Sequence, residues 1–139
     1  MKAFDTDILT EILAGNPAYA ERLAEIPLAE QAVPIVVVEE IFRGRLNAIR
    51  QAEAGKARVT IDQAYGLFEQ TLADLRELHV LSFTAPAEEL LKEWRKKKVK
   101  GATHDLRIAA SCVVSSATLV TRNRRDFQQV PGLSVEFWD

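Results

Sequence analysis

Several acidic residues stand where an apolar run ends or a helix begins, which are places where a fold can gather side chains. The four candidates are Asp5, Glu40, Asp105 and Asp126. In an open α/β sheet, the carboxyl ends of the strands point into the crevice where ligands bind. Mg²⁺ takes oxygen ligands, generates hydroxide from bound water and stabilises charge on a phosphate. Each acid alone is also explained by a helix dipole or a local cap, so the metal-site hypothesis depends on the four together.

Asp105 gives the sharpest form of this hypothesis. The segment Asp105–Ser115 is apolar on all sides, which predicts a buried helix. Asp105 is in line with Ile108 and Cys112, so it begins on a face that is otherwise buried. An unpaired carboxylate there is costly or becomes protonated, so it requires a cation, a cluster of donors or a metal. The alternative is an acid in the first turn that only complements the helix dipole.

Two clusters of cationic residues lie close in sequence to these acids. Five of the six residues from Arg95 to Lys100 are cationic, and a second cluster surrounds Asn123. Such runs are often only solvated helix ends, but they could also hold the phosphates of a nucleic acid. The candidates for phosphate contact are Lys96, Lys97, Lys98, Arg122 and Arg124. The net charge is only −2, so attraction between the whole protein and nucleic acid is no argument here.

The elements that must position these residues alternate between strand and helix. We predict strands at about 1–4, 32–38, 79–83, 117–121 and 133–138. We predict helices at about 7–13, 18–26, 41–55, 61–75, 86–100 and 105–115, and a turn at 123–129. The third and fourth helices should form a hairpin, and the apolar stripe of the fourth is core or a partner-binding groove. The alternation predicts an α/β fold, a parallel sheet covered on both faces, in a single domain over residues 1–139.

Composition excludes several classes of protein. Cys112 is the only cysteine, so an internal disulfide and a thiolate metal site are excluded, and a reducing cytosol is expected. No stretch approaches the roughly 20 apolar residues of a membrane span, and early acids argue against an export signal. We therefore expect a cytoplasmic protein.

Four segments, in this order along the chain, resemble the PIN-domain ribonucleases, and most closely the VapC toxin branch of toxin–antitoxin pairs. They are Asp5–Asp7, Glu40–Gly44, Asp105–Ala110 and Leu119–Phe127, and Val130–Leu133 and Trp138 also resemble that branch. The resemblance implies a compact three-layer α/β/α sandwich with a parallel sheet, usually as a homodimer. It also implies an acidic pocket that binds Mg²⁺ or Mn²⁺ and cleaves RNA, and a cognate VapB-like antitoxin that blocks it.

The resemblance also assigns roles by motif. The three family acids match Asp5, Glu40 and Asp105, and the fourth acid is assigned to Asp126. Two hydroxyl positions that support the family site match Thr6 and Thr121.

Two positions depart from the family pattern. Asp7 stands where the family often has Asn, and Asn123 stands where other PIN branches carry the fourth acid. The choice between Asp126 and Asn123 for the fourth position therefore stays open from the sequence alone.

Three other classes of protein compete with this interpretation. A haloacid-dehalogenase-type phosphatase would use Asp5 and Asp7, but that family has Thr or Val where this chain has Leu9. A signalling receiver domain needs an acid at the end of a middle strand, and the strand at 79–83 runs into Thr84 instead. A PIN fold that only binds RNA or a partner would have lost one of the acids, and none is plainly lost.

Overall fold

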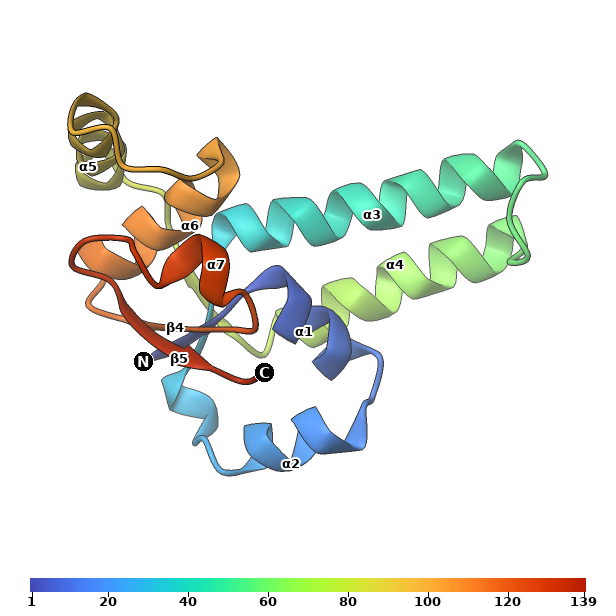
Figure 1. Ribbon diagram of the computed structural model, residues 1–139. Coiled ribbons are helices and arrows are strands. Elements are labelled where there is room, and N and C mark those ends of the chain that lie inside the picture. The colour runs from blue at the N-terminus through green and yellow to red at the C-terminus, as the bar shows by residue number, and fades with distance from the viewer.

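The computed structural model describes residues 1–139, in which strands and helices alternate around a central sheet (Figure 1). The strands are β1 (Lys2–Phe4), β2 (Gln31–Pro34), β3 (His79–Leu81), β4 (Thr118–Thr121) and β5 (Ser134–Phe137). The first helices are α1 (Thr6–Leu13), α2 (Pro17–Ala24), the 3₁₀ turn η1 (Leu28–Glu30), α3 (Ile35–Glu53) and α4 (Ile61–Leu75). The remaining helices are α5 (Ala85–Lys96), α6 (Thr103–Val114) and α7 (Arg124–Phe127).

The five strands form one parallel sheet in the order β3-β2-β1-β4-β5. Helices lie on both sides of it, with α6 and α7 on one side and α2 on the other (Figure 1). The expected α/β fold with a parallel sheet is therefore confirmed. Because every strand runs the same way, all five carboxyl ends meet at one edge, where a ligand site is expected.

The hydrophobic core packs against both faces of the central strands. Twenty-six buried residues form one cluster, and Ala3, Phe4, Leu119 and Val120 of the two central strands have no exposed surface. Helix α6 is buried along most of its length, as its apolar sequence predicts, and its last residue, Val114, is exposed. Small residues in α6 allow this close approach to the sheet, so the helix that carries Asp105 is fixed in place.

The strand predicted at 32–38 is wrong in its second half. The strand β2 ends at Pro34, which is the N-cap of α3, and the β-branched residues that follow are helical. Val36 and Val37 are buried against the core, so burial outweighs the strand preference of β-branched side chains. As a consequence Glu40 lies in the second turn of α3, where the dipole of the helix N-terminus has largely faded.

The acid at the end of β1 also begins the next helix. Helix α1 is capped by Asp5, whose side chain accepts from the backbone N–H of Thr6, and the N-cap of α6 is Ala102, with Thr103 as its first residue. The turn predicted at 123–129 contains the short helix α7, capped by the side chain of Asn123.

The predicted hairpin of α3 and α4 is confirmed, and it projects away from the sheet (Figure 1). Near the sheet its apolar stripe is core, since Leu75 is buried and Phe68 packs on Phe42 with ring centroids 5.3 Å apart. Farther out Ile61 and Tyr65 are exposed, so they do not belong to the core. None of the helices has both the length and the apolar character needed to cross a membrane.

Candidate active site

Asp5 is held at the end of β1 by the neighbouring strand. Its backbone N–H donates to the carbonyl of Val120 at 2.9 Å, which extends the β1–β4 pairing by one residue. This places Thr121 beside it, and the Thr121 hydroxyl donates to Asp5 Oδ2 at 2.7 Å. The backbone N–H of Thr6 donates to Oδ1 at 2.8 Å. Burial raises the pKa of the Asp5 carboxyl, and the two hydrogen bonds partly offset that rise.

Glu40 is joined to Asp5 through Thr6. The Thr6 hydroxyl donates to Glu40 Oε2, which links α1 to α3. On the other side of this carboxylate His104 Nε2 lies 3.8 Å from Glu40 Oε1 and 3.2 Å from Glu39 Oε1. His104 Nε2 is buried but makes no well-aligned hydrogen bond. The structure therefore brings Glu40 into the site through the hydroxyl of Thr6.

Asp126 reaches the same site from α7. Asn123 Nδ2 donates to Asp126 Oδ2 at 2.5 Å, and Asn123 Oδ1 accepts from the backbone N–H of Asp126 at 3.1 Å. The Asn123 backbone N–H donates to the Thr121 hydroxyl at 3.1 Å. A continuous chain of hydrogen bonds therefore runs from Asp126 through Asn123 and Thr121 to Asp5. Thr6, Thr121 and Asn123 are therefore the links between Glu40, Asp5 and Asp126.

Asp105 differs from the other three acids of the site. It has no cation beside it, and no hydroxyl, amide or backbone N–H donates a hydrogen bond to it. It lies half-buried in the first turn of α6, and its polar neighbour is another acid, Asp126. Burial, followed by the charges of Asp126, Asp5 and Glu40, raises the pKa of its carboxyl from 3.8 to about 6. The four predicted acids are thus close enough to act on one another. From the sequence, Asp105 should require a cation, a cluster of hydrogen-bond donors or a metal. The structure places neither a cation nor a donor cluster beside it.

The donor set suits a hard divalent cation, but the four acids do not converge on a single position. They offer only carboxylate oxygens, the ligands that Mg²⁺ and Mn²⁺ accept. No group of three or more acidic, histidine or cysteine side chains is close enough to hold one ion in common. Three of the acids instead accept hydrogen bonds from Thr6, Thr121 and Asn123. Binding an ion would require the side chains to move closer than they stand.

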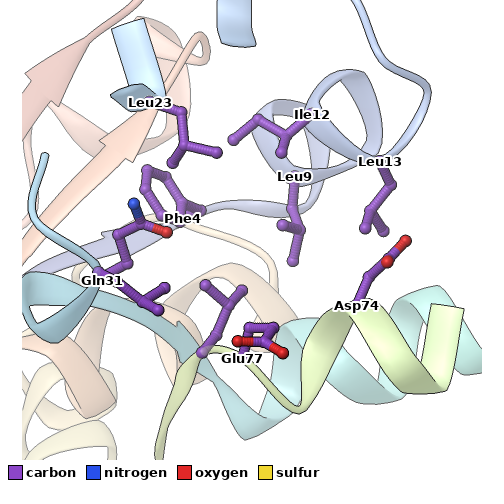
Figure 2. Close-up of a pocket in the computed structure, with 10 residues that line it drawn as sticks. Phe4, Leu9, Ile12, Leu13, Leu23, Gln31, Asp74 and Glu77 are labelled. Atoms are coloured by element: carbon purple, nitrogen blue, oxygen red, sulfur yellow. The ribbon is translucent and has the colours of Figure 1, made fainter. Parts of the chain in front are cut away.

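Neither the thiol of Cys112 nor an apolar cavity beside α1 belongs to this site. Burial raises the pKa of the Cys112 thiol to about 12, so it is not a nucleophile at neutral pH. Figure 2 shows an apolar cavity of about 280 Å³ between α1, α2 and the end of α4, lined by Leu9, Ile12 and Leu23 among others. None of the four acids lines this cavity, so it is separate from the candidate active site.

The predicted phosphate contacts fall into two groups: the exposed lysines, and the arginines that already bind other side chains. Lys96 and Lys98 are exposed and unpaired, and Lys97 makes an exposed ion pair with Glu93 at 2.9 Å. Arg122 is engaged with Tyr19 through a hydrogen bond of 3.2 Å. Arg124 makes a bidentate ion pair with the carboxylate of Asp139.

Replacing Lys96, Lys97 and Lys98 together with Gln should weaken RNA binding for all sequences alike. The slope of log affinity against log salt should fall by roughly 0.7 for each lost phosphate contact on a single strand. Filter binding from low to moderate salt measures this slope, and replacing the exposed Lys56 and Arg58 of the α3–α4 loop provides a control. An unchanged slope would mean that the lysine run is only a solvated helix end.

Sequence reasoning missed two residues that contribute to the site. Arg95 belongs to the basic run, but it donates to the Gly101 carbonyl at 3.1 Å and to the Thr103 hydroxyl at 2.7 Å. It therefore restrains the first turn of α6, which has no side-chain cap of its own. His104 lies against Glu39 and Glu40, and its position beside Asp105 is the only signal for this in the sequence.

Comparison with known proteins identifies the family to which this fold belongs. Residues 2–133 match the PIN domain family, and the chain belongs to it. A stretch of 69 residues is 35% identical to Ribonuclease VapC2 of Rickettsia felis. That match covers 47% of this chain and 52% of the relative, so it spans about half the relative's length.

Several solved structures share the fold over almost the whole chain. The crystal structure of VapBC2 from Rickettsia felis bound to a promoter DNA fragment matches with a TM-score of 0.73 and 23% identity. That match covers 99% of this chain and 98% of the other. FitAcB from Neisseria gonorrhoeae matches with a TM-score of 0.78 and 19% identity, over 97% and 96% of the two chains. The resemblance to the PIN family, inferred from the four acidic segments, is confirmed.

Proposed function

We propose that this protein is a metal-dependent endoribonuclease of the VapC type, the toxin of a toxin–antitoxin pair. The observation that carries the proposal is Asp105, a half-buried acid with a raised pKa and no cation beside it. Three further carboxylates lie close enough to raise its pKa. In a structural ion pair, a neighbouring cation offsets the charge of an acid. The charges that act on Asp105 all come from other acids, which supports a site that binds a metal ion.

The residues that would hold Mg²⁺ or Mn²⁺ are Asp5, Glu40, Asp105 and Asp126. When bound, the ion supplies a hydroxide from water and stabilises charge on the phosphate. Thr121 and Thr6 hold Asp5 and Glu40 in place, and Asn123 holds Asp126. Hydrogen bonds that orient metal ligands in this way typically contribute about 10- to 100-fold to metal affinity or activity.

A partner protein belongs to the proposal as well. The similar solved structures are toxin–antitoxin complexes, which supports a VapB-like antitoxin as the inhibitor of this chain. The family precedent also supports a cytoplasmic homodimer built from a single PIN domain.

The phosphatase alternative that would use Asp5 as a nucleophile is not favoured by its surroundings. Asp5 is only 6% exposed, and each of its carboxylate oxygens already accepts a hydrogen bond. A nucleophile needs a free oxygen that faces its substrate. The non-catalytic alternative requires a lost acid, and all four are present at one sheet edge.

Adding Mg²⁺ or Mn²⁺ should raise the melting temperature of the purified protein, because an ion that binds only the folded state stabilises it by mass action. At 100 times the dissociation constant the gain is about 2.7 kcal/mol. RNA cleavage should require the same ion and stop on chelation. Ca²⁺, which prefers a larger and more flexible ligand shell, serves as the comparison ion. Cleavage that persists in excess chelator would refute the proposed mechanism.

A further inference from the structure

Three arginines of this protein stack on aromatic rings, and all three pairs lie around the carboxyl ends of β4 and β5. The pairs are Arg22 over Trp138 at 5.4 Å, Arg122 over Tyr19 at 5.8 Å and Arg124 over Phe137 at 4.4 Å from the ring centroids. The aromatic rings continue inward, since Tyr19 packs on Trp138 and Trp138 on Phe4. Such cation–π contacts restrain the position of each guanidinium group next to its ring.

A cleft of about 220 Å³ opens between two of these pairs. It is lined by Ala18, Tyr19, Arg22, Trp138 and Asp139, from α2 and the residues that follow β5. Tyr19 is half-buried and held by the hydrogen bond from Arg122, so the wall of the cleft is preorganised. Its lining combines aromatic faces, a guanidinium and a carboxylate that can accept a hydrogen bond.

The cleft lies one strand away from the acids. The backbone N–H of Trp138 donates to the Thr121 carbonyl at 2.9 Å, while the Thr121 hydroxyl donates to Asp5 at 2.7 Å. The single residue Thr121 therefore joins the wall of the cleft to the first of the four candidate acids.

Charge around the cleft favours a base over a phosphate. Arg122 lies 3.8 Å from Glu11, and Arg124 is paired with Asp139. Lys2 is likewise paired with Glu136 at 2.7 Å. Arg22, the cation that lines the cleft, makes no ion pair, but it lies close enough to Glu136 and Asp139 to help lower the pKa values of both carboxyls. The positive charge around the cleft is therefore largely offset by carboxylates. Flat aromatic and guanidinium surfaces, in contrast, suit the faces of unpaired RNA bases.

We propose that the cleft between Tyr19, Arg22 and Trp138 binds the unpaired base next to the cleaved phosphate and so sets where RNA is cut. This inference rests on the proposed ribonuclease function and adds the substrate position to it. The base stacks on the Tyr19–Arg22 wall, and Asp139 accepts a hydrogen bond from its edge. The cleft thereby selects for the identity of one nucleotide, whereas Lys96, Lys97 and Lys98 act without regard to sequence.

The test compares cleavage of a pool of random RNA oligonucleotides by the wild-type protein with Mg²⁺, reading the cut sites by sequencing. Wild type should prefer one base at one position beside the cut. Tyr19→Ala and Arg22→Gln should each lower cleavage at the preferred sites about tenfold, the size of one base-stacking contact. Both should also weaken the preference at that position and leave other positions unchanged. Tyr19→Phe, which keeps the ring, should retain most of it. Arg125→Gln, a charge-matched change at an exposed residue of α7, should leave the preference as it is.

A second measurement reports binding without cleavage. In a Trp94→Phe background Trp138 is the only tryptophan, so titration with nucleoside monophosphates should quench its fluorescence in the wild-type cleft and not in Tyr19→Ala. Circular dichroism melting checks that each variant is folded. Cleavage with an unchanged base preference in both cleft variants would overturn the base site while leaving the ribonuclease intact. If the cleft variants escaped inhibition by a protein partner while their base preference stayed unchanged, the base site would also be overturned. The cleft would then be assigned to that partner. Absence of any RNA cleavage by wild type would instead refute the proposed function.

Discussion

Asp105→Asn should reduce RNA cleavage by at least about 100-fold, the loss typical of removing a preorganised electrostatic group from an active site. The same substitution should leave the metal-free protein as stable as wild type or more stable. The reason is that Asp105 has no cation beside it, and the charges of Asp126, Asp5 and Glu40 act on it. The Asn side chain has the same shape as Asp but no charge, so it removes the repulsion from these three acids. A structural acid would behave in the opposite way, because its loss would destabilise the fold.

The stability gain should depend on pH in a defined direction. Because the folded-state pKa of Asp105 is about 6 and its ordinary value is 3.8, the folded state binds the proton more tightly than the unfolded state. Stability of the metal-free wild type should therefore fall as pH rises from about 4 to about 7. The full shift would correspond to about 3 kcal/mol, but Asp105 is only half-buried and solvent screening reduces this to about 1 kcal/mol.

Urea unfolding of the metal-free protein at several pH values measures this effect. Asp105→Asn should flatten the pH dependence without removing it, because the raised pKa of Asp5 acts in the same direction. Asp62→Asn is a suitable control, since Asp62 lies on the exposed first turn of α4, far along the hairpin from the acids. A wild-type protein whose stability rises with pH over this range would contradict the assignment of Asp105 as an uncompensated acid.

The sequence is most informative where local chemistry and burial agree. Asp105 stands out because it opens an apolar helix, and the structure finds that helix buried with the acid unsatisfied. Asp5 is inferred from the abrupt end of an apolar segment, and it is buried at the end of β1. In both cases one residue departs from the pattern of its neighbours, and that departure is visible without tertiary information.

Errors arise where a tertiary contact decides between two local preferences. Residues 35–38 favour a strand by composition, but Val36 and Val37 pack into the core from a helix. Arg122 and Arg124 look like free cations because neither Tyr19 nor Asp139 is near them in sequence. Contacts between residues as distant as 19 and 122 leave no periodic signal, so the stacked arginines and aromatic rings could only be found in three dimensions.

Asp126 and Asn123 should differ sharply in what they contribute, and this is the second large effect that we expect. Asp126→Asn should reduce cleavage and metal affinity by more than Asn123→Ala does. Only Asp126 supplies a charge, and of the three neighbouring acids its charge raises the pKa of Asp105 most. Asn123 supplies hydrogen bonds, since it caps α7 and donates to Asp126 at 2.5 Å. Losing the cap should cost about 1 kcal/mol of stability, and losing the hydrogen bond to Asp126 about 10- to 100-fold in metal affinity.

Asn123→Asp tests the same division of roles from the other side. Asp can still cap α7, so the fold should survive. The new carboxylate would face Asp126 without the amide donor, which should lower the stability of the metal-free protein and tighten binding of Mg²⁺. Calorimetric titration with Mg²⁺ and unfolding with and without the ion separate the two effects. If Asp126→Ala cleaved RNA at the wild-type rate while Asn123→Ala were inactive, the fourth position would belong to Asn123. The roles of Asp5, Glu40 and Asp105 would be unaffected, because the hydrogen bonds that hold Asp5 and Glu40 do not pass through Asp126.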